Sequence, residues 1–567
     1  MDEGLETTAP DTGRKLLGLR DAVQRCVRPG MRLHLAAGIG GPSAVICEII
    51  RQYRGRDPGF TLIQSTVTGH ALNLVHTGLV ARLICSVCAQ ISASGRPSRV
   101  VRQALERGRV RMENWTLCSL QQRLMAGAFG LPFMPTRSVQ GSGMAADNEA
   151  AFKTVEDPFG SGARVGLAGA LAPDISVVHG CVADCDGNTI LAAPYGEDVW
   201  GALASRGGVL VTVERVVPTE YIQRYAALVK IPAYAVRAVV EAPLGLHPFS
   251  MANPGIRGMR PYEKDVDFLD ALYGAAASDR ELDAWIDDWV LGCGDHAGYL
   301  RRLGKGRIAG LRSRAVEAPD GPAPAPAAST PEEMMLVALS REIAGSVGTN
   351  GHKTVLAGAG LAATAAFLAY FRLGPGGFEL ATGNGQIGYT PVAGASILAS
   401  EANVRTSKML TDTVTLQGVV VGGAGNRCLS VLGAGQTDRY GNINSTVTSD
   451  GRFLVGSGGV NDALNAREAI LCLKQSRDRF VDRLAYVTGC GGAVSTVVST
   501  MGVFRKPSPE DELHLMACFP DSGGRSLQER IGEIRNHCGW ELKTAPVVRE
   551  VPGPDPEELA LLRRLAP

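Results

Sequence analysis

The feature that most constrains the fold is a recurring unit in which an apolar, strand-like run ends at a glycine-rich loop and a helix follows. Residues 32–37 (RLHLAA) form the first such run, and residues 44–53 form the amphipathic helix after it. The loop between them contains Gly38, Gly40 and Gly41. Its N–H groups at a helix N-terminus predict an anion or oxyanion site, with a plain tight turn as the alternative.

Further buried-type strands alternate with helices along the chain. Residues 175–179 and 208–213 are rich in β-branched side chains, and residues 354–357 lead into a second glycine turn before a helix at 361–370. Continuous apolar strands separated by helices are typical of a parallel or mixed sheet that is covered on both faces. We therefore predict an α/β protein.

A proline- and alanine-rich segment at 315–332 (AVEAPDGPAPAPAASTPE) has the composition of a stiff linker and cannot bury a core. It separates a first domain at 16–314 from a second domain at 333–548. Residues 1–15 and 549–567 are expected to form an N-terminal and a C-terminal tail.

The two halves share a short motif, D-x-x-G-N, which begins at Asp184 in the first half and at Asp438 in the second. In such a turn the aspartate caps backbone N–H groups and the glycine, Gly187 or Gly441, takes a positive φ. Its presence after an apolar strand in both halves predicts two related α/β domains in one chain.

Composition excludes several classes of partner. Among 567 residues the formal net charge is +1, with both signs interspersed, so we expect no nucleic-acid partner and no membrane partner. The polar, acidic start of the sequence is unlike a signal peptide, which predicts a cytoplasmic protein. Thirteen cysteines are spread along the chain and are expected to be reduced. Cys85 and Cys88 have C-x-x-C spacing without a second pair, so we expect no metal site.

Residues 378–391 (FELATGNGQIGYTP) form the most unusual stretch, with Gly383, Gly385 and Gly388 after an apolar run. A strand that ends in such a loop lets the backbone approach a ligand closely. These glycines also spell G-x-G-x-x-G, the dinucleotide-binding fingerprint. However, Tyr389-Thr390-Pro391 follows where the phosphate-binding helix should begin, which argues against that interpretation.

Several motifs occur together in a fixed order. They are RLMAGAFGLPFMPTRS at 123–138, DPFGSG at 157–162, PDISVVHGCVADCDGN at 173–188, VTVERVV at 211–217, GAGQTDRYGNINST at 433–446, GSGGVNDALNA at 456–466 and YVTGCGG at 486–492. With the first glycine loop, they resemble family I CoA-transferases of the glutaconate CoA-transferase type, with both subunits fused. The resemblance implies two tandem open α/β domains with mixed or parallel sheets and an acyl-CoA site at their interface.

In that family a glutamate of the second domain attacks the acyl-CoA carbonyl and forms covalent intermediates, which is nucleophilic catalysis by a carboxylate. The family's E-x-G-x-I pattern falls on residues 383–387, so Gly383 stands where the nucleophile belongs. The resemblance places Gly383 and Asn384 at the catalytic loop. It also implies that backbone amides of glycine loops hold the oxyanion, and the candidates are Gly38, Gly40, Gly41, Gly385, Gly422, Gly423 and Gly425.

Four side chains are further candidates for the site: Glu379 as a substitute nucleophile, Glu113 as a general base or acid, Glu214 as a site residue and His179 as a proton shuttle. Glu379 lies four positions earlier, at least ~12 Å away along an extended strand. Glu113 is the carboxylate before the LPF motif; branches of the family without the glutamate include hydrolases that use an acid from the first domain and a decarboxylase with cysteine instead. Glu214 follows a buried strand, and His179 lies at the end of another, where an interior structural role is the alternative.

The sequence therefore predicts an enzyme that acts on an acyl-CoA or related thioester by noncanonical chemistry. Hydrolysis, decarboxylation and C–C bond cleavage are the alternatives within this fold, and a non-catalytic CoA-ester-binding or scaffold protein is the alternative of another class. We expect no covalently bound cofactor, because coenzyme A enters as part of the substrate, and we expect a homodimer.

Overall fold

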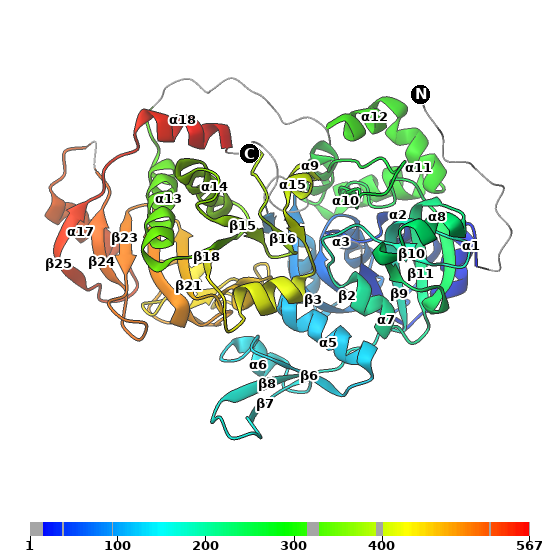
Figure 1. The fold of residues 1–567 in the computed structure, drawn as a ribbon, viewed down its shortest axis with the longest axis horizontal. Coiled ribbons are helices and arrows are strands. Elements are labelled where there is room, and N and C mark those ends of the chain that lie inside the picture. Colours follow the sequence, from blue (N-terminus) through cyan, green and yellow to red (C-terminus); the bar gives the residue numbers. More distant parts are fainter. Residues whose placement is uncertain are drawn as a thin grey trace.

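The computed structural model describes residues 15–36, 39–92, 95–314, 328–392, 401–520 and 523–565. Figure 1 shows two α/β halves side by side, blue to green for the first and green to red for the second. Each half is built around a ten-stranded sheet, as expected from the alternating strands and helices. Within the described ranges, no helix is long and apolar enough to cross a membrane.

The first sheet has a parallel core in the order β13–β11–β9–β1–β2–β3–β5. The strands of this half are β1 (Arg32–Ala36), β2 (Phe60–Val67), β3 (Val80–Ile91), β4 (Gly95–Pro97), β5 (Arg111–Asn114), β6 (Phe133–Thr136), β7 (Phe152–Glu156), β8 (Arg164–Gly169), β9 (Ile175–Ala183), β10 (Thr189–Ile190), β11 (Val209–Val216), β12 (Val229–Ile231) and β13 (Val236–Glu241). Every residue of β9 is buried, which explains its unbroken apolar sequence.

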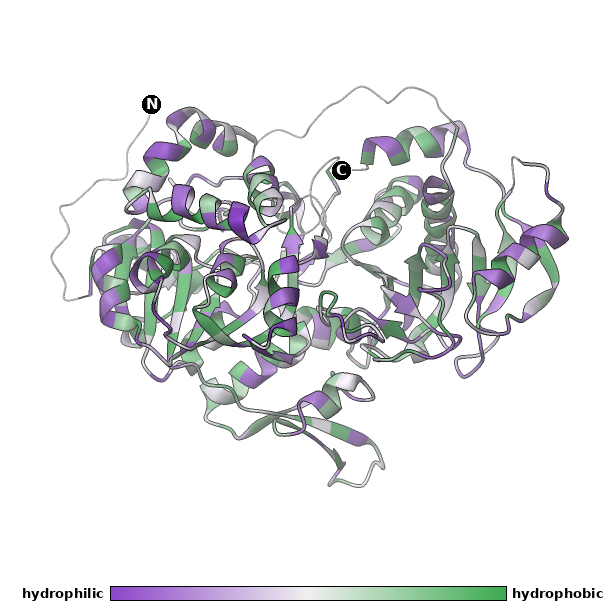
Figure 2. Cartoon of the chain, turned by 180° about the vertical axis from the view of Figure 1, so that it is seen from behind, coloured by the Kyte–Doolittle hydropathy of each residue, from purple (hydrophilic) through white to green (hydrophobic). Residues whose placement is uncertain are grey.

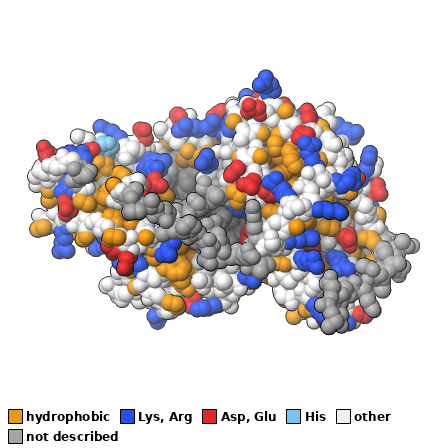
Figure 3. Space-filling model, turned by 90° about the horizontal axis from the view of Figure 1, so that it is seen from above, with side chains coloured by type: hydrophobic (Ala, Val, Ile, Leu, Met, Phe, Trp, Pro, Cys, Tyr) orange, Lys and Arg blue, Asp and Glu red, His pale blue; other side chains and the backbone are white. Residues whose placement is uncertain are grey.

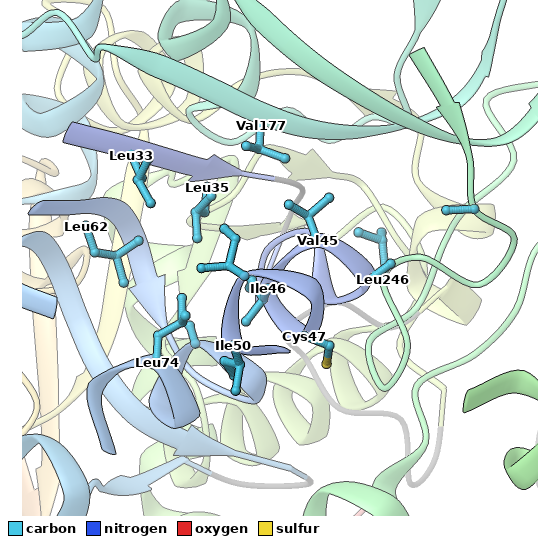
Figure 4. Packing of buried hydrophobic residues seen from close by; sticks show 14 of the residues in the cluster. Leu33, Leu35, Val45, Ile46, Cys47, Ile50, Leu62, Leu74, Val177 and Leu246 are labelled. Atoms are coloured by element: carbon cyan, nitrogen blue, oxygen red, sulfur yellow. The ribbon is translucent and has the colours of Figure 1, made fainter. Parts of the chain in front are cut away.

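Helices cover this sheet. They are α1 (Leu19–Cys26), α2 (Ser43–Tyr53), α3 (His70–His76), α4 (Arg99–Glu106), α5 (Leu117–Phe129), α6 (Gly143–Asp147), α7 (Asp198–Ala204), α8 (Thr219–Arg224), α9 (Val266–Ala275), α10 (Asp279–Ile286), α11 (His296–Leu303) and α12 (Lys305–Arg314), with shorter turns η1 (Ala226–Leu228), η2 (Ala233–Ala235) and η3 (Asp287–Leu291). In Figure 4, Leu35 of β1 and Leu62 of β2 lie near Ile46 and Ile50 of α2 within one buried cluster. Burial of each such side chain contributes about 1.5–3 kcal/mol, which fixes α2 on the sheet.

A small antiparallel sheet, in the order β6–β8–β7, lies apart from both large sheets at the bottom of Figure 1. Its first strand carries the second proline of the LPFMPTRS motif, and proline disfavours a helix interior. The strand follows α5 directly, so this sheet is held next to the boundary between the halves.

The second sheet runs β17–β16–β15–β14–β18–β21–β22–β23–β24–β25 and is mixed, with a parallel centre from β15 to β22. Its strands are β14 (Thr354–Ala357), β15 (Glu379–Thr382), β16 (Gln386–Ile387), β17 (Met409–Leu410), β18 (Cys428–Gly433), β21 (Glu468–Leu473), β22 (Val494–Ser499), β23 (Gly502–Arg505), β24 (His514–Cys518) and β25 (Thr544–Glu550). A separate hairpin joins β19 (Gln436–Thr437) to β20 (Ile443–Asn444). In Figure 2 the strands of both sheets are largely green, and purple is most frequent on the outer helices.

The helices of the second half are α13 (Pro331–Asn350), α14 (Leu361–Leu373), α15 (Glu401–Thr406), α16 (Val460–Ala463), α17 (Leu527–Asn536) and α18 (Pro556–Leu565), with turns η4 (Thr415–Val421) and η5 (Gly491–Ala493). Figure 1 shows α13, α14 and α18 together above the sheet. Helix α13 begins within the expected linker, because Thr330 and Glu333 form a capping box around Pro331. Most of the linker, residues 315–327, and residues 1–14 lie outside the described residues.

The expected C-terminal tail, residues 549–567, is not a loose tail. It contains the end of β25 and helix α18, which packs on α13 and α14. Arg341 of α13 pairs with Glu558, and Arg563 pairs with Glu333 at 2.7 Å. The charges of this terminal helix are therefore matched by those of a neighbouring helix.

The D-x-x-G-N motif forms the same turn in both halves, as predicted. The Asp184 carboxylate accepts from the amides of Gly187 and Asn188, and the Asp438 carboxylate accepts from the amide of Asn442. The φ angles of Gly187 and Gly441 are 102° and 71°. This shared turn supports the interpretation that the two halves are related units.

The halves touch through main-chain and side-chain hydrogen bonds. The amide of Leu117 donates to Gly458 O at 3.0 Å, and the amide of Ser457 donates to Asn114 Oδ1 at 2.9 Å. On the face shown in Figure 3, basic and acidic side chains are interspersed, in keeping with the near-zero net charge.

Candidate active site

The stretch 378–391 forms a tight hairpin between β15 and β16 at the boundary between the halves. Gly385 has a φ of 109°, and a Cβ there would lie 2.4 Å from Thr411 O, so only glycine fits. Gly388 also has a positive φ. Because the chain continues as a hairpin and not as a helix, G-x-G-x-x-G here is not a dinucleotide-binding loop, as the sequence indicated.

Gly383 differs from Gly385 and Gly388 because its φ angle does not lie in the left-handed region that favours glycine. A Cβ at this position would lie 2.9 Å from Gln417 Nε2 and 3.8 Å from Leu117 Cδ1. The space that a side chain would use is therefore taken by the amide of Gln417, which is 3% exposed. Nothing in the backbone requires glycine at position 383.

A cavity of about 70 Å³ lies beside this loop and takes residues from both halves; we call it the loop cavity. It is lined by Ile39, His179, Leu191, Ala192, Ala193, Pro194, Asp198, Leu246, Ser250, Met251, Ala252, Asn384, Gln386 and Val404. The first glycine loop thus reaches the cavity through Ile39, and the second reaches it through Asn384 and Gln386. The structure brings together the two glycine loops that the sequence singled out.

Asn384 is oriented by its neighbours. Thr382 Oγ1 accepts from the amide of Gln386 at 3.4 Å and donates to Asn384 Oδ1, which also accepts from Gln386 Nε2 at 3.5 Å. The carbonyl oxygen of Asn384 is thus engaged within its own loop, and the residue lines the cavity. Its amide nitrogen is a neutral hydrogen-bond donor.

Asp198 is the carboxylate among the residues that line the loop cavity. It begins α7, and its Oδ2 accepts from the amide of Gly196 at 2.8 Å. The preceding residue, Glu197, is buried and accepts from the amide and hydroxyl of Ser65. Burial, followed by the charge of Asp198, raises the pKa of Glu197 to about 7. Burial therefore favours the neutral form of Glu197, behind the cavity wall.

His179 and Glu214 are neighbours, but the imidazole is fully engaged. His179 Nε2 lies 3.0 Å from Glu214 Oε1, and Nδ1 lies 2.8 Å from Thr212 Oγ1. Glu214 also accepts from Tyr262 Oη at 3.1 Å and from the amide of Leu244 at 3.0 Å. With both ring nitrogens bonded, His179 fits the structural alternative better than the role of a proton shuttle.

Glu113 does not line the loop cavity. On β5 it pairs with Arg82 and, at 3.2 Å, with Arg123, and it accepts from Trp115 Nε1 at 3.3 Å. Arg123 is 5% exposed and lies over the Trp115 ring, 4.2 Å from its centroid. Burial lowers the pKa of Arg123 to about 10, so a carboxylate beside it stabilises its charge. This geometry favours a structural role for Glu113.

The other sequence candidates lie at the edges of the site. Glu379 pairs with Lys408 at 2.5 Å and does not line the loop cavity. The amide of Gly385 donates to Thr382 O at 3.0 Å, and those of Gly422 and Gly423 donate to Gln417 O and Val419 O at 3.0 Å each. These amides are engaged within their own turns, so the side chain of Asn384 is the better placed donor.

The first glycine loop needs its glycines. Gly40 and Gly41 have φ angles of 98° and 75°, and a Cβ at Gly40 would lie 2.2 Å from the Phe249 ring. Gly38 lies outside the described residues. Gly425 has open space around its Cα and does not line the loop cavity. The oxyanion role expected for these glycines stays a prediction.

Comparisons of the sequence with known proteins point to the coenzyme A transferases. A model of the coenzyme A transferase family matches residues 18–242. One of the two subunits of glutaconate CoA-transferase from Acidaminococcus fermentans is 29% identical over 318 residues, which cover 53% of this chain and 94% of that protein.

The 3-oxoadipate CoA-transferase of Pseudomonas knackmussii matches through both of its subunits. One is 30% identical over 302 residues, covering 52% of this chain and 99% of its own length. The other is 34% identical over 147 residues, covering 24% of this chain and 56% of its own length.

The fold is also that of a solved acyl-CoA transferase from Escherichia coli O157:H7, determined as a thioester complex with CoA. The TM-score is 0.66 at 16% identity, covering 96% of this chain and 97% of that one. Two α/β halves with a cavity between them thus define a CoA-transferase fold. The chain belongs to the coenzyme A transferase family and carries the counterparts of both subunits in one polypeptide.

Sequence reasoning missed Asp198 and Gln417. Asp198 follows the cis peptide between Ala193 and Pro194 by four residues, in a segment (AAPYGED) whose proline and glycine were the available signal. No sequence pattern marks Gln417, because it contacts Gly383, which lies 34 positions earlier and meets it only in the folded chain.

Proposed function

We propose that this chain acts on an acyl-CoA or related thioester without forming a covalent intermediate on an enzyme carboxylate. The observation that carries the proposal is the pair Gly383 and Gln417. The position of the family's nucleophile has no side chain, and a neutral amide fills the space that one would use. Neither group can form an acyl anhydride, so the double-displacement route of ordinary transfer is closed at this position.

The loop cavity supports a different chemistry. The amide of Asn384 donates to the thioester carbonyl and stabilises the negative charge that develops on its oxygen, as an oxyanion or as an enolate. In hydrolysis or hydrolytic C–C cleavage, Asp198 on the opposite half takes the proton of the attacking water and returns it to the departing thiolate or carbanion. In decarboxylation CO2 leaves, and the resulting enolate takes its proton from solvent. A donor and a base on the same cavity suffice for hydrolysis, decarboxylation or C–C bond cleavage next to the thioester, since none of these reactions needs an enzyme-bound acyl group.

The remaining features of the proposal follow the family. Coenzyme A enters as part of the substrate, and no covalently bound cofactor is required. The active unit is a homodimer in the cytoplasm. The shared fold with an acyl-CoA transferase solved as a CoA thioester complex supports a thioester ligand.

The test is to titrate the protein with CoA and a panel of acyl-CoAs by calorimetry and to identify the products by mass spectrometry. We expect micromolar to millimolar binding of at least one thioester and release of free CoA or of a shortened acyl-CoA. Transfer of CoA to added carboxylic acids at family-like rates would contradict the noncovalent route. Absence of binding across the panel would leave the scaffold alternative.

The panel is repeated with Asn384→Ala and with Asn536→Ala as a matched control. Asn536 lies on α17, is exposed and is remote from the cavity. We expect turnover to fall only in Asn384→Ala.

A further inference from the structure

A second cavity, of about 260 Å³, lies on the other side of Gln417, between the two halves. We call it the arginine cavity. It is lined by Cys118, Gln122, Pro135, Thr136, Arg137, Ser138, Gln140, Arg164, Val165, Gln417, Gly418, Gly422 and Asn465. Its walls come from α5 and the small β6–β8–β7 sheet on one side and from η4 on the other. Figure 1 shows that α5 and this small sheet lie on the same side of the molecule.

The charged side chains that line this cavity are all positive. Arg137 and Arg164 are both present, and no Asp or Glu is among the lining residues. Arg137 Nη1 donates to Gly422 O at 2.6 Å, which anchors its guanidinium across the interface between the halves. The Arg164 guanidinium, on β8, makes no hydrogen bond or ion pair with any described residue. Two guanidinium groups from exposed side chains thus line one cavity together with amides and hydroxyls.

Two carboxylates lie near the walls of the cavity. Glu156 of β7 stands opposite Arg164 in the β7–β8 pairing and does not line the cavity. Asp462 of α16 lies behind the wall, where it accepts from the amide of Cys118 at 3.0 Å and from Ser138 Oγ at 2.6 Å. The Asp462 carboxylate therefore stabilises the N-terminus of α5 and accepts from a hydroxyl. It forms no ion pair with Arg137 or Arg164 among the described contacts. The lining of the cavity thus contains two arginines and no carboxylate.

We propose that the arginine cavity is an anion-binding subsite, in which Arg137 and Arg164 hold a carboxylate or phosphate group of the thioester substrate. Guanidinium groups bind such oxyanions through paired N–H donors, and this geometry is better suited to them than to a neutral amide or hydroxyl. The inference rests on the proposed function, because it takes the anion to be part of an acyl-CoA.

The volume of the arginine cavity limits the size of the ligand that it can hold. Pockets that enclose drug-sized molecules measure about 300–1,000 Å³, so a cavity of about 260 Å³ holds a small anionic group and a short arm rather than a whole nucleotide. The anion has two sources, a free carboxylate at the end of the acyl group or a phosphate of coenzyme A. Gln417 lines this cavity and also lies against Gly383, in the loop whose next residue, Asn384, lines the loop cavity.

The experiment compares butyryl-CoA with succinyl-CoA, which have four-carbon acyl groups without and with a terminal carboxylate, and repeats both as dephospho-CoA thioesters. Dissociation constants are measured for the wild type, Arg137→Gln, Arg164→Gln and the control Arg483→Gln, whose side chain is exposed in the second half. Arg164→Lys tests whether charge without the paired donors is enough.

We expect Arg137→Gln and Arg164→Gln each to weaken succinyl-CoA binding at least about tenfold and butyryl-CoA binding less than threefold, which assigns the subsite to the acyl carboxylate. A phosphate source predicts equal weakening of both thioesters and loss of that effect in the dephospho series. Unchanged affinities for all four thioesters in both variants would overturn the subsite.

The binding experiment also distinguishes failure of this subsite from failure of the proposed function. If the wild type binds no thioester, the proposed function fails, and titration with succinate and inorganic phosphate alone tests the cavity by itself. In that case, binding that Arg164→Gln abolishes supports the subsite, and no binding overturns it. Arg164 has no protein partner among the described residues, so its variant is expected to fold even if Arg137→Gln does not.

Discussion

The side-chain amide of Gln417 lies 2.9 Å from the point where a Cβ on Gly383 would stand. Gln417 is almost fully buried, donates weakly to Gly383 O at 3.5 Å, and its Oε1 has no partner among the described residues. A buried polar oxygen without a partner costs about 1–3 kcal/mol. The Gln417 amide therefore occupies the space that a side chain at position 383 would use.

Gly383→Glu is predicted to fold. Its φ is not in the left-handed region, and the one obstacle is the end of a flexible side chain. We expect the double variant Gly383→Glu/Gln417→Ala, which removes that obstacle, to form an enzyme–CoA thioester when it is incubated with a bound acyl-CoA. Intact-protein mass spectrometry detects the adduct. Gly532→Glu, in open space on α17, is the matched control and should form none. A folded, ligand-binding double variant without an adduct would show that this position does not face the thioester.

Asn384→Ala is predicted to lower kcat about 10²–10³-fold, the usual cost of removing one oxyanion donor. The melting temperature should change little, because Asn384 is partly exposed and its oxygen bonds only within its own loop. Steady-state kinetics with the substrate found in the panel measures this effect. A drop in affinity with unchanged kcat would mean that Asn384 binds the ground state instead.

Asp198→Asn and Glu113→Gln should have opposite effects. Loss of the base at the loop cavity is expected to lower kcat about 10²–10⁴-fold with little change in stability. Glu113→Gln leaves the buried Arg123 without its carboxylate and should lower the free energy of unfolding by about 1–3 kcal/mol with kcat retained. Urea unfolding and kinetics on both variants separate the roles. A catalytic defect in Glu113→Gln at full stability would return Glu113 to the active site.

Asp462 should make stability depend on pH. Burial raises the pKa of this carboxyl from 3.8 to about 6. The folded state then holds a proton that the unfolded chain has lost, so stability falls as pH rises from about 4 to about 6 and is constant above that. A shift of about two pH units corresponds to about 3 kcal/mol.

The control for this effect is Asp462→Asn, which cannot titrate. Relative to this variant, the wild type should lose stability across that window in urea unfolding. Parallel pH profiles for the two proteins would contradict the assignment to Asp462.

Much of the fold could be predicted from the sequence, because its signals are local. The buried run of β9, the capping box at Thr330 and the turns at Asp184 and Asp438 each follow from a few neighbouring residues. The glycine-rich hairpin at 378–391 also stood out, through its glycines. The lining of the loop cavity was less predictable, since Asp198 of the first half and Asn384 of the second come together only in the folded chain. Glu113 appeared catalytic because its partners Arg82 and Arg123 lie 31 and 10 positions away and are brought to it by the sheet and α5.

The central claim is that acyl-CoA is processed without an acyl or CoA adduct on the protein. The most direct test is to quench the enzyme during turnover of an acyl-CoA, treat it with hydroxylamine or borohydride, and map its carboxylates by peptide mass spectrometry. We predict unmodified peptides throughout residues 378–391 and at every other carboxylate while product accumulates. A modified side chain at Glu379, or at any other carboxylate, formed and lost at the rate of turnover, would contradict the account and restore covalent transfer.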